Sequence, residues 1–211
     1  MHSYLQRAYM TGLIAMAALA AATGANAQNR LPPIPAEQFT AQQQKAADDF
    51  KAARGTALSG PFMPLLRSPE LMTRARAMGD YLRFNSALPP RLSEFVILLT
   101  AREWTQNYEW GVHYDLAIKA GVKPAIAKAI ADGRRPDGMS DEEDAVYTFV
   151  TELQRHRSVS DATYSRMLER FGERAVVDTT GIVGYYTLLA MVLNVARTPP
   201  DGAPALAPLQ R

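Results

Sequence analysis

The sequence contains no cysteine, carries little net charge and has no sustained alternation of β-branched residues. Without cysteine the chain forms no disulfide, so its stability must come from packing. The formal net charge is +2, with acidic and basic residues mixed along the chain. A nucleic-acid partner would need a clustered basic surface. The missing alternation leaves no strong strand candidate. These absences favour an all-α protein that does not bind nucleic acid.

The first 27 residues have the features of a secretory signal. Arg7 is the only Lys or Arg before an apolar stretch over residues 13–22, and Ala-Asn-Ala at 25–27 offers small residues for a signal peptidase. Such a signal has a charged start, an apolar run of about 7–15 residues and an A-x-A end. A membrane-spanning helix needs about 20 apolar residues. We predict that residues 1–27 are removed, leaving a periplasmic or secreted protein without a membrane partner.

Proline, glycine and capping residues divide the rest of the chain into helices. The signals predict a compact helical bundle of about seven or eight helices. We expect a leader and first helix over residues 28–59, one domain over 60–197 and a loose tail over 198–211. The expected helices cover residues 40–54, 69 to the Pro89-Pro90 pair, 91–121 in two pieces, 124–132, 141–157, 161–172 and 173–196.

The helix that begins at Pro69 has a clear apolar pattern. Leu71, Ala75, Met78 and Leu82 follow one another at helical spacing. Residues three and four positions apart share one face of a helix. We therefore predict that these four side chains are buried.

One pair of residues has the spacing that proton transfer needs. Beyond the signal there are two histidines, His113 and His156. His156 lies between two arginines at an expected helix end, which is typical of a solvated residue. His113 lies in an apolar helix four residues after Glu109, so the two side chains share one face. A carboxylate beside an imidazole is competent for acid–base chemistry, although it also suits a purely structural pair.

Glu94 is a third polar residue in an apolar stretch, fifteen residues before Glu109. In one continuous helix the two would lie about 22 Å apart. Residues 105–107 (Thr-Gln-Asn) offer capping side chains for a break. If the helix breaks there and folds back, Glu94 and His113 converge.

Three segments resemble a known family. They are residues 91–98 (RLSEFVIL), 109–113 (EWGVH) and 117–122 (AIKAGV), and residues 140–150 and 184–194 add to the likeness. Together they resemble the carboxymuconolactone decarboxylase family of the alkyl hydroperoxidase D-like superfamily, over about residues 60–197. The resemblance implies a helical fold and self-association as a trimer or hexamer, and we expect no cofactor.

The superfamily has two branches, and the absent cysteines distinguish them. The hydroperoxidase branch has two cysteines at the positions of Gln106 and Glu109, and its chemistry needs a thiolate. Thiol peroxidase activity is therefore not expected. The decarboxylase branch keeps a glutamate four residues before the histidine, as Glu109 and His113 do. The resemblance implies that His113 is the acid/base, Glu109 its partner and Glu94 a further polar group.

Four other residues are candidates for substrate binding. Arg91 and Arg102 would hold a carboxylate, although salt bridges elsewhere explain them equally well. Trp110 and Tyr185 would line a pocket, although aromatic residues at helical spacing often belong to the core. A metal site would need a third ligand at a recognisable spacing, and none stands beside Glu109 and His113.

The sequence thus predicts a lyase-type acid–base enzyme for a small-molecule substrate, an organic acid or lactone. The export signal points away from intermediates of aromatic breakdown, which are processed inside cells. The alternative is a non-catalytic, oligomeric small-molecule-binding protein that retains the fold. The state of His113 distinguishes the two, because an enzyme needs it beside a pocket.

Overall fold

The computed structural model describes residues 29–200 and 206–208 of the chain, so the predicted signal peptide lies outside the described residues. The described part is all helical and contains no strand, which confirms the predicted fold class. The helices are α1 (Ala41–Arg54), α2 (Phe62–Leu65), α3 (Pro69–Phe84), α4 (Pro90–Glu103), α5 (Asn107–Lys119), α6 (Pro124–Ala131), α7 (Asp141–His156) and α8 (Asp161–Ala196), with a short 3-10 turn at Ala36–Gln38.

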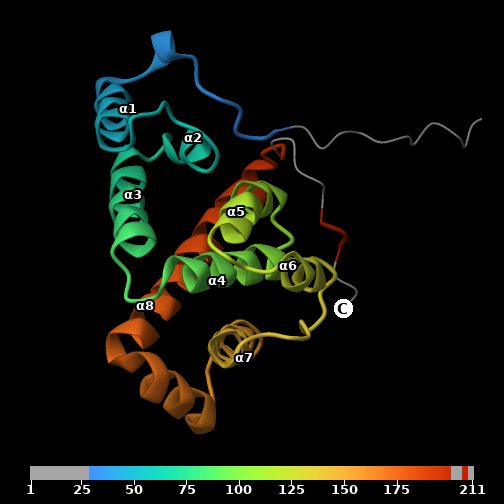
Figure 1. The fold of residues 1–211 in the computed structure, drawn as a ribbon. Helices are drawn as coiled ribbons and strands as arrows, with labels where there is room; N and C mark the ends of the chain where they lie inside the picture. Colours follow the sequence, from blue (N-terminus) through green and yellow to red (C-terminus); the bar gives the residue numbers. More distant parts are fainter. Residues whose placement is uncertain (1–28, 201–205, 209–211) are drawn as a thin grey trace, which may run out of the picture.

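Helix α4 is the centre of the core. It packs against α5, α6, α7 and α8, while α1, α2 and α3 stand together on one side (Figure 1). Leu92, Phe95, Val96 and Leu98 on α4 are fully buried. Because these residues cover more than one face, α4 must be enclosed from several sides. Several of its polar residues are therefore held inside the fold, and Glu94, with a side chain 14% exposed, is largely enclosed as well.

Helix α8 combines two helices that the sequence predicted separately. Gly172 interrupts it with φ 79° and ψ 170°, a conformation that glycine adopts without steric cost. The helix is long and apolar enough to cross a membrane by length and composition alone, but half of its most apolar stretch is buried inside the fold. That burial is what a core helix requires. The second half of α8 forms one wall of the cavity described below.

The buried face of α3 differs from the predicted one. Ala75 and Leu82 are buried as expected, but Leu71 and Met78 are each 44% exposed. The buried residues of α3 are Met72, Ala75, Gly79 and Leu82. The helix is rotated because Gly79 has no side chain and lets the Tyr185 ring of α8 approach its backbone. The prediction considered only residues with apolar side chains and therefore missed this contact at a glycine.

Replacing Gly79 with alanine is expected to destabilise the protein by about 1–3 kcal/mol, the usual cost of overpacking. The added methyl group would overlap the ring and hydroxyl of Tyr185, which is itself only 2% exposed. Gly184→Ala is the matched control, because nothing lies within 4 Å of its Cβ position. The control is expected to gain about 0.5–1 kcal/mol from helix propensity. Urea unfolding of both variants is the measurement, and a stabilised Gly79→Ala would contradict the packing described.

The described part of the C-terminal tail is docked, contrary to the prediction of a loose tail. Leu206 is buried, and its backbone N–H donates to Asn107 Oδ1 at 2.6 Å. Arg102 Nη2 donates to the carbonyl oxygen of Ala207 at 2.7 Å. The tail is held because one apolar side chain enters the core while its backbone is hydrogen-bonded at the junction of α4 and α5.

Candidate functional site

The junction between α4 and α5 creates the site. Thr105 has φ 47°, so the chain turns sharply after α4. Gln106 then caps α5, because its Oε1 accepts from the backbone N–H groups of Tyr108 (2.6 Å) and Glu109 (3.3 Å). Asn194 of α8 secures the junction by accepting from Gln106 Nε2 at 3.0 Å. The predicted helix break is therefore confirmed, and α5 folds back along α4.

This arrangement brings Glu94, His113 and Glu109 together. His113 Nδ1 lies 2.6 Å from Glu94 Oε2, and His113 Nε2 lies 3.6 Å from Glu109 Oε2. A carboxylate can only accept, so Nδ1 donates to Glu94, and Nε2 faces Glu109. The two carboxyl groups thus occupy opposite edges of one imidazole. Among the described residues, no group of three or more acidic or histidine side chains is arranged to hold a metal ion.

Glu109 has an unusual environment for a carboxyl group. It is 3% exposed, and its Oε1 has no hydrogen-bond partner among the described residues. Burial raises the pKa of Glu109, against the opposing charges of His113 and Arg83. A buried carboxyl group without hydrogen bonds favours its neutral, protonated form. Glu109 is therefore suited to donate a proton.

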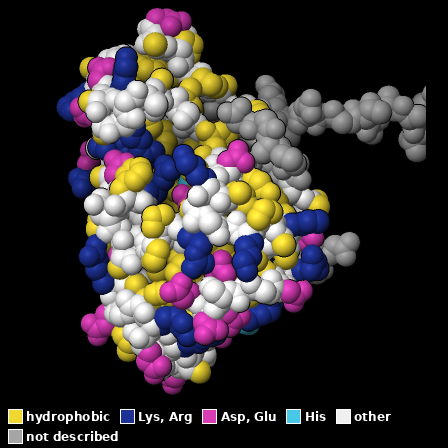
Figure 2. Space-filling model, viewed as in Figure 1, with side chains coloured by type: hydrophobic (Ala, Val, Ile, Leu, Met, Phe, Trp, Pro, Cys, Tyr) yellow, Lys and Arg dark blue, Asp and Glu magenta, His cyan; other side chains and the backbone are white. Residues whose placement is uncertain are grey.

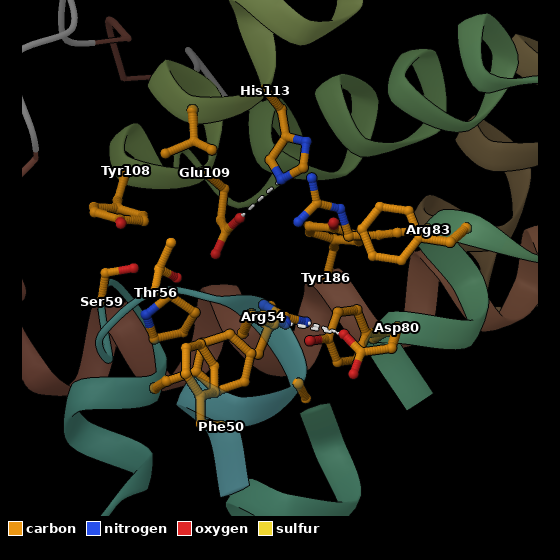
Figure 3. Close-up of a pocket in the computed structure, with 17 residues that line it drawn as sticks. Phe50, Arg54, Thr56, Ser59, Asp80, Arg83, Tyr108, Glu109, His113 and Tyr186 are labelled. Carbon is orange, nitrogen blue, oxygen red and sulfur yellow. Dashed lines mark hydrogen bonds and ion pairs between the residues drawn. The ribbon is translucent and has the colours of Figure 1, made fainter. Parts of the chain in front are cut away.

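Glu109 and His113 face a cavity of about 530 Å³ between α1, α3, α5 and α8. The hollow is visible in Figure 2 beside α1 and α3, with Lys and Arg side chains at its rim. Figure 3 shows Glu109 pointing into it, below His113. The cavity is lined by Phe50, Ala53, Arg54, Thr56, Ser59, Pro61, Phe62, Asp80, Arg83, Phe84, Tyr108, Glu109, Val112, His113, Tyr185, Tyr186 and Leu189.

Two tyrosines of α8 close the inner wall. The Tyr186 ring meets His113 edge to face, with ring centroids 5.0 Å apart and an interplanar angle of 87°. Burial raises the pKa of Tyr185 to about 12 and raises that of Tyr186 well above its ordinary value. Both hydroxyl groups therefore stay neutral at physiological pH and can act as hydrogen-bond donors.

Of the four predicted substrate-binding residues, one lines the cavity and three do not. Tyr185 lines the cavity, while Arg91, Arg102 and Trp110 do not. Arg91 instead forms ion pairs with Glu142 (2.8 Å) and Glu143 on α7. The side chains at these three positions leave α4 and α5 on faces turned away from the cavity.

Arg102 and Trp110 each have another structural setting. Arg102 is 4% exposed and hydrogen-bonded to the C-terminal segment. Trp110 is buried, with its ring centroid 6.1 Å from that of Tyr114. Because both side chains are buried elsewhere in the fold, neither reaches the cavity.

The cations at the cavity are Arg54 and Arg83, which the sequence analysis did not single out. Arg54 comes from α1, and its Nε donates to Asp80 Oδ1 at 2.9 Å. Arg83 comes from the last turn of α3. Neither has a recognisable spacing to Glu109 or His113 in the sequence. Only the packing of α1 and α3 beside α5 brings them to the site.

Comparisons with known proteins agree with this architecture. Residues 69–152 match the sequence profile of the carboxymuconolactone decarboxylase family. This segment includes Glu94, Glu109 and His113 but neither α1 nor the second half of α8. No curated protein sequence matches the chain.

Several solved structures share the fold. A peroxidase-related protein from Ralstonia eutropha JMP134, described as an alkylhydroperoxidase AhpD core, has TM-score 0.66 and 16% identity over 82% of this chain and 92% of that chain. A protein of unknown function from Agrobacterium tumefaciens has TM-score 0.59 and 14% identity over 66% of this chain and 96% of that one. The debrominase Bmp8 with 2,3,4-tribromopyrrole has TM-score 0.65 and 11% identity, covering 83% and 94%. At these identities the likeness shows the fold alone.

Proposed function

We propose, on the premise that this chain belongs to the carboxymuconolactone decarboxylase family through residues 69–152, that it is a lyase-type acid–base enzyme acting on a small organic acid or lactone. The observation that carries the proposal is Glu109, a buried carboxyl group whose Oε1 is unpaired among the described residues and which lines the cavity. The debrominase Bmp8 has a similar fold, which supports chemistry other than peroxide reduction.

In the proposed reaction the bond between a carboxylate and its neighbouring carbon breaks, and carbon dioxide leaves. The electron pair of that bond stays on the carbon and is delocalised into a conjugated carbonyl group. Glu109 then donates its proton to the carbon and becomes a carboxylate. This role fits a carboxyl group whose pKa is raised by burial.

His113 would restore the proton to Glu109. A proton from solvent binds Nε2, and the imidazolium is stabilised by Glu94 at Nδ1. The proton then passes from Nε2 to the Glu109 carboxylate, 3.6 Å away. Glu94 thus keeps the ring in the orientation and tautomer that face Glu109, as an orienting carboxylate does in other acid–base sites.

The location and assembly of the enzyme are also proposals. The predicted signal peptide supports action in the periplasm or outside the cell, on a substrate available there. Self-association is supported by large apolar side chains that are exposed in the single chain, such as Phe84 (69%), Val177 (68%) and Val195 (62%). A homo-oligomer would cover such side chains.

Carbon dioxide release from a panel of lactone acids and β-keto acids tests the function. Purified protein is expected to decarboxylate at least one of them, and His113→Ala to lower the rate by about 10²- to 10⁴-fold, the range for a lost acid–base group. His156→Ala is the control, because His156 is exposed at the end of α7 and away from the cavity.

The opposite results separate the alternatives. If wild-type protein binds members of the panel but releases no carbon dioxide, the binding-protein interpretation replaces the enzyme. If His113→Ala retains full activity, His113 has no part in proton transfer.

A further inference from the structure

Arg83 differs from the other cation that lines the cavity. The Nε and Nη2 atoms of Arg54 lie 2.9 and 2.8 Å from Asp80 Oδ1, so its charge is compensated. Arg83 has no carboxylate within ion-pair distance in the part of the chain that the structure describes, and its guanidinium lies 5.3 Å from the ring centre of Phe84. It is nevertheless half-buried in the cavity wall. A partly buried cation without a counter-ion is a favourable site for an anion.

The ion pairs around the cavity leave one positive charge that an anionic ligand could neutralise. Arg54 and Arg76 both pair with Asp80, and Glu94 accepts from His113. Of the two guanidinium groups that line the cavity, Arg54 shares Asp80 with Arg76, and the burial of Glu109 opposes the charged form of its carboxyl group. Arg83 is the lining guanidinium whose charge has no ion-pair partner among the described residues. A ligand with one carboxylate would neutralise it, whereas a second carboxylate would enter uncompensated.

Arg83 and the proton donor act on the same part of the cavity. Figure 3 shows the Arg83 side chain extending from α3 across Tyr186 toward His113. The charge of Arg83 is close enough to Glu109 to lower its pKa, although burial, the larger cause, raises it. A carboxylate on Arg83 therefore has its neighbouring carbon near Glu109, as proton donation to that carbon requires.

The walls of the cavity favour a flat ligand. The rings of Phe50 and Phe62, whose centroids are 4.8 Å apart, form one side of the cavity, while Tyr186 forms another. Aromatic walls bind planar unsaturated groups through their faces and edges. A cavity of about 530 Å³ is of the size that small-molecule sites have.

We propose that Arg83 binds the single carboxylate of a small, planar, unsaturated or aromatic-like acid, whose body lies along Tyr186 and whose carboxyl-bearing carbon faces Glu109. This assignment rests on the acid–base function proposed above. The carboxylate held by Arg83 is the group released as carbon dioxide, and the carbon receives the proton of Glu109 in its place. The product has lost the charge that Arg83 holds, so it binds more weakly than the substrate and leaves.

Calorimetric titration with benzoate and with its neutral analogue benzamide tests the assignment. Wild-type protein is expected to bind benzoate at least about tenfold more tightly than benzamide, the gain typical of one charge-assisted contact. Arg83→Gln should abolish this preference, and Arg83→Lys should keep part of it. Arg74→Gln is the matched control on the same helix, because Arg74 is 77% exposed and pairs with Glu70 away from the cavity.

Benzene-1,4-dicarboxylate supplies the test of charge number. It is expected to bind wild-type protein more weakly than benzoate, because among the described residues that line the cavity its second carboxylate finds only Arg54, which Asp80 already pairs. Three results would each overturn the proposal. They are equal affinities of wild-type protein for benzoate and benzamide, an unchanged preference for benzoate in Arg83→Gln, and tighter binding of the dicarboxylate than of benzoate. Glu109→Gln should still bind benzoate. A protein that prefers benzoate but releases no carbon dioxide thus contradicts the enzyme function while leaving the anion site in place.

Discussion

Glu109→Gln is expected to lower turnover by about 10²- to 10⁴-fold while leaving the folded protein at least as stable as wild type at neutral pH. Glutamine has nearly the same shape but no proton to donate. Its amide also carries no charge, so it avoids the cost of an ionised carboxyl group in this buried place. A loss of activity together with retained or increased stability is the signature of a functional rather than a structural residue.

The stability of Glu109→Gln relative to wild type is expected to depend on pH, and the direction of the pKa shift of Glu109 determines how. Burial raises the pKa of Glu109 in the folded state above its unfolded value. The resulting stabilisation is fully present below the ordinary carboxyl pKa and is lost as pH rises through the raised folded value. Glu109→Gln cannot ionise, so its stability relative to wild type should increase as pH rises through that window.

Thermal unfolding of wild type and Glu109→Gln between about pH 4 and pH 9 measures this difference, since the ordinary carboxyl pKa is about 4.3. Asp115→Asn is the control, because Asp115 is an exposed acid on the same helix. A variant that is less stable than wild type at every pH would show that Glu109 and His113 form a structural pair.

Glu94→Gln is expected to lower kcat/KM by about 10³- to 10⁴-fold with little change in substrate affinity, as in other sites that lose an orienting carboxylate. The amide can donate to Nδ1 of His113, where the carboxylate can only accept. The ring proton then moves to Nε2, which faces Glu109 and can no longer accept a proton. The change thus acts through the tautomer of the ring.

Steady-state kinetics and the ¹⁵N chemical shifts of His113 measure the two parts of this prediction. Glu103→Gln is the control on α4, because Glu103 is half-exposed and does not line the cavity. Activity within about tenfold of wild type, or an unchanged tautomer, would contradict the orienting role of Glu94.

The sequence alone was enough to identify the all-α fold and the pairing of Glu109 with His113. Helix spacing is local, so residues four apart share a face whatever the rest of the chain does. The break at residues 105–107 was also predictable, because capping side chains act on the adjacent backbone. If the helix breaks there and folds back, Glu94 must approach His113. The structure shows that the two side chains are in contact.

The tertiary structure alone decided which cations reach the cavity and which buried carboxyl group keeps an oxygen without a hydrogen-bond partner among the described residues. Arg91 lies near Glu94 in sequence, yet it pairs with α7, while Arg83 of α3 enters the site. Such contacts depend on the rotation of each helix, and that rotation depends on close packing between distant residues such as Gly79 and Tyr185. Sequence spacing carries no information on these contacts, because they join helices that only the folded core brings together.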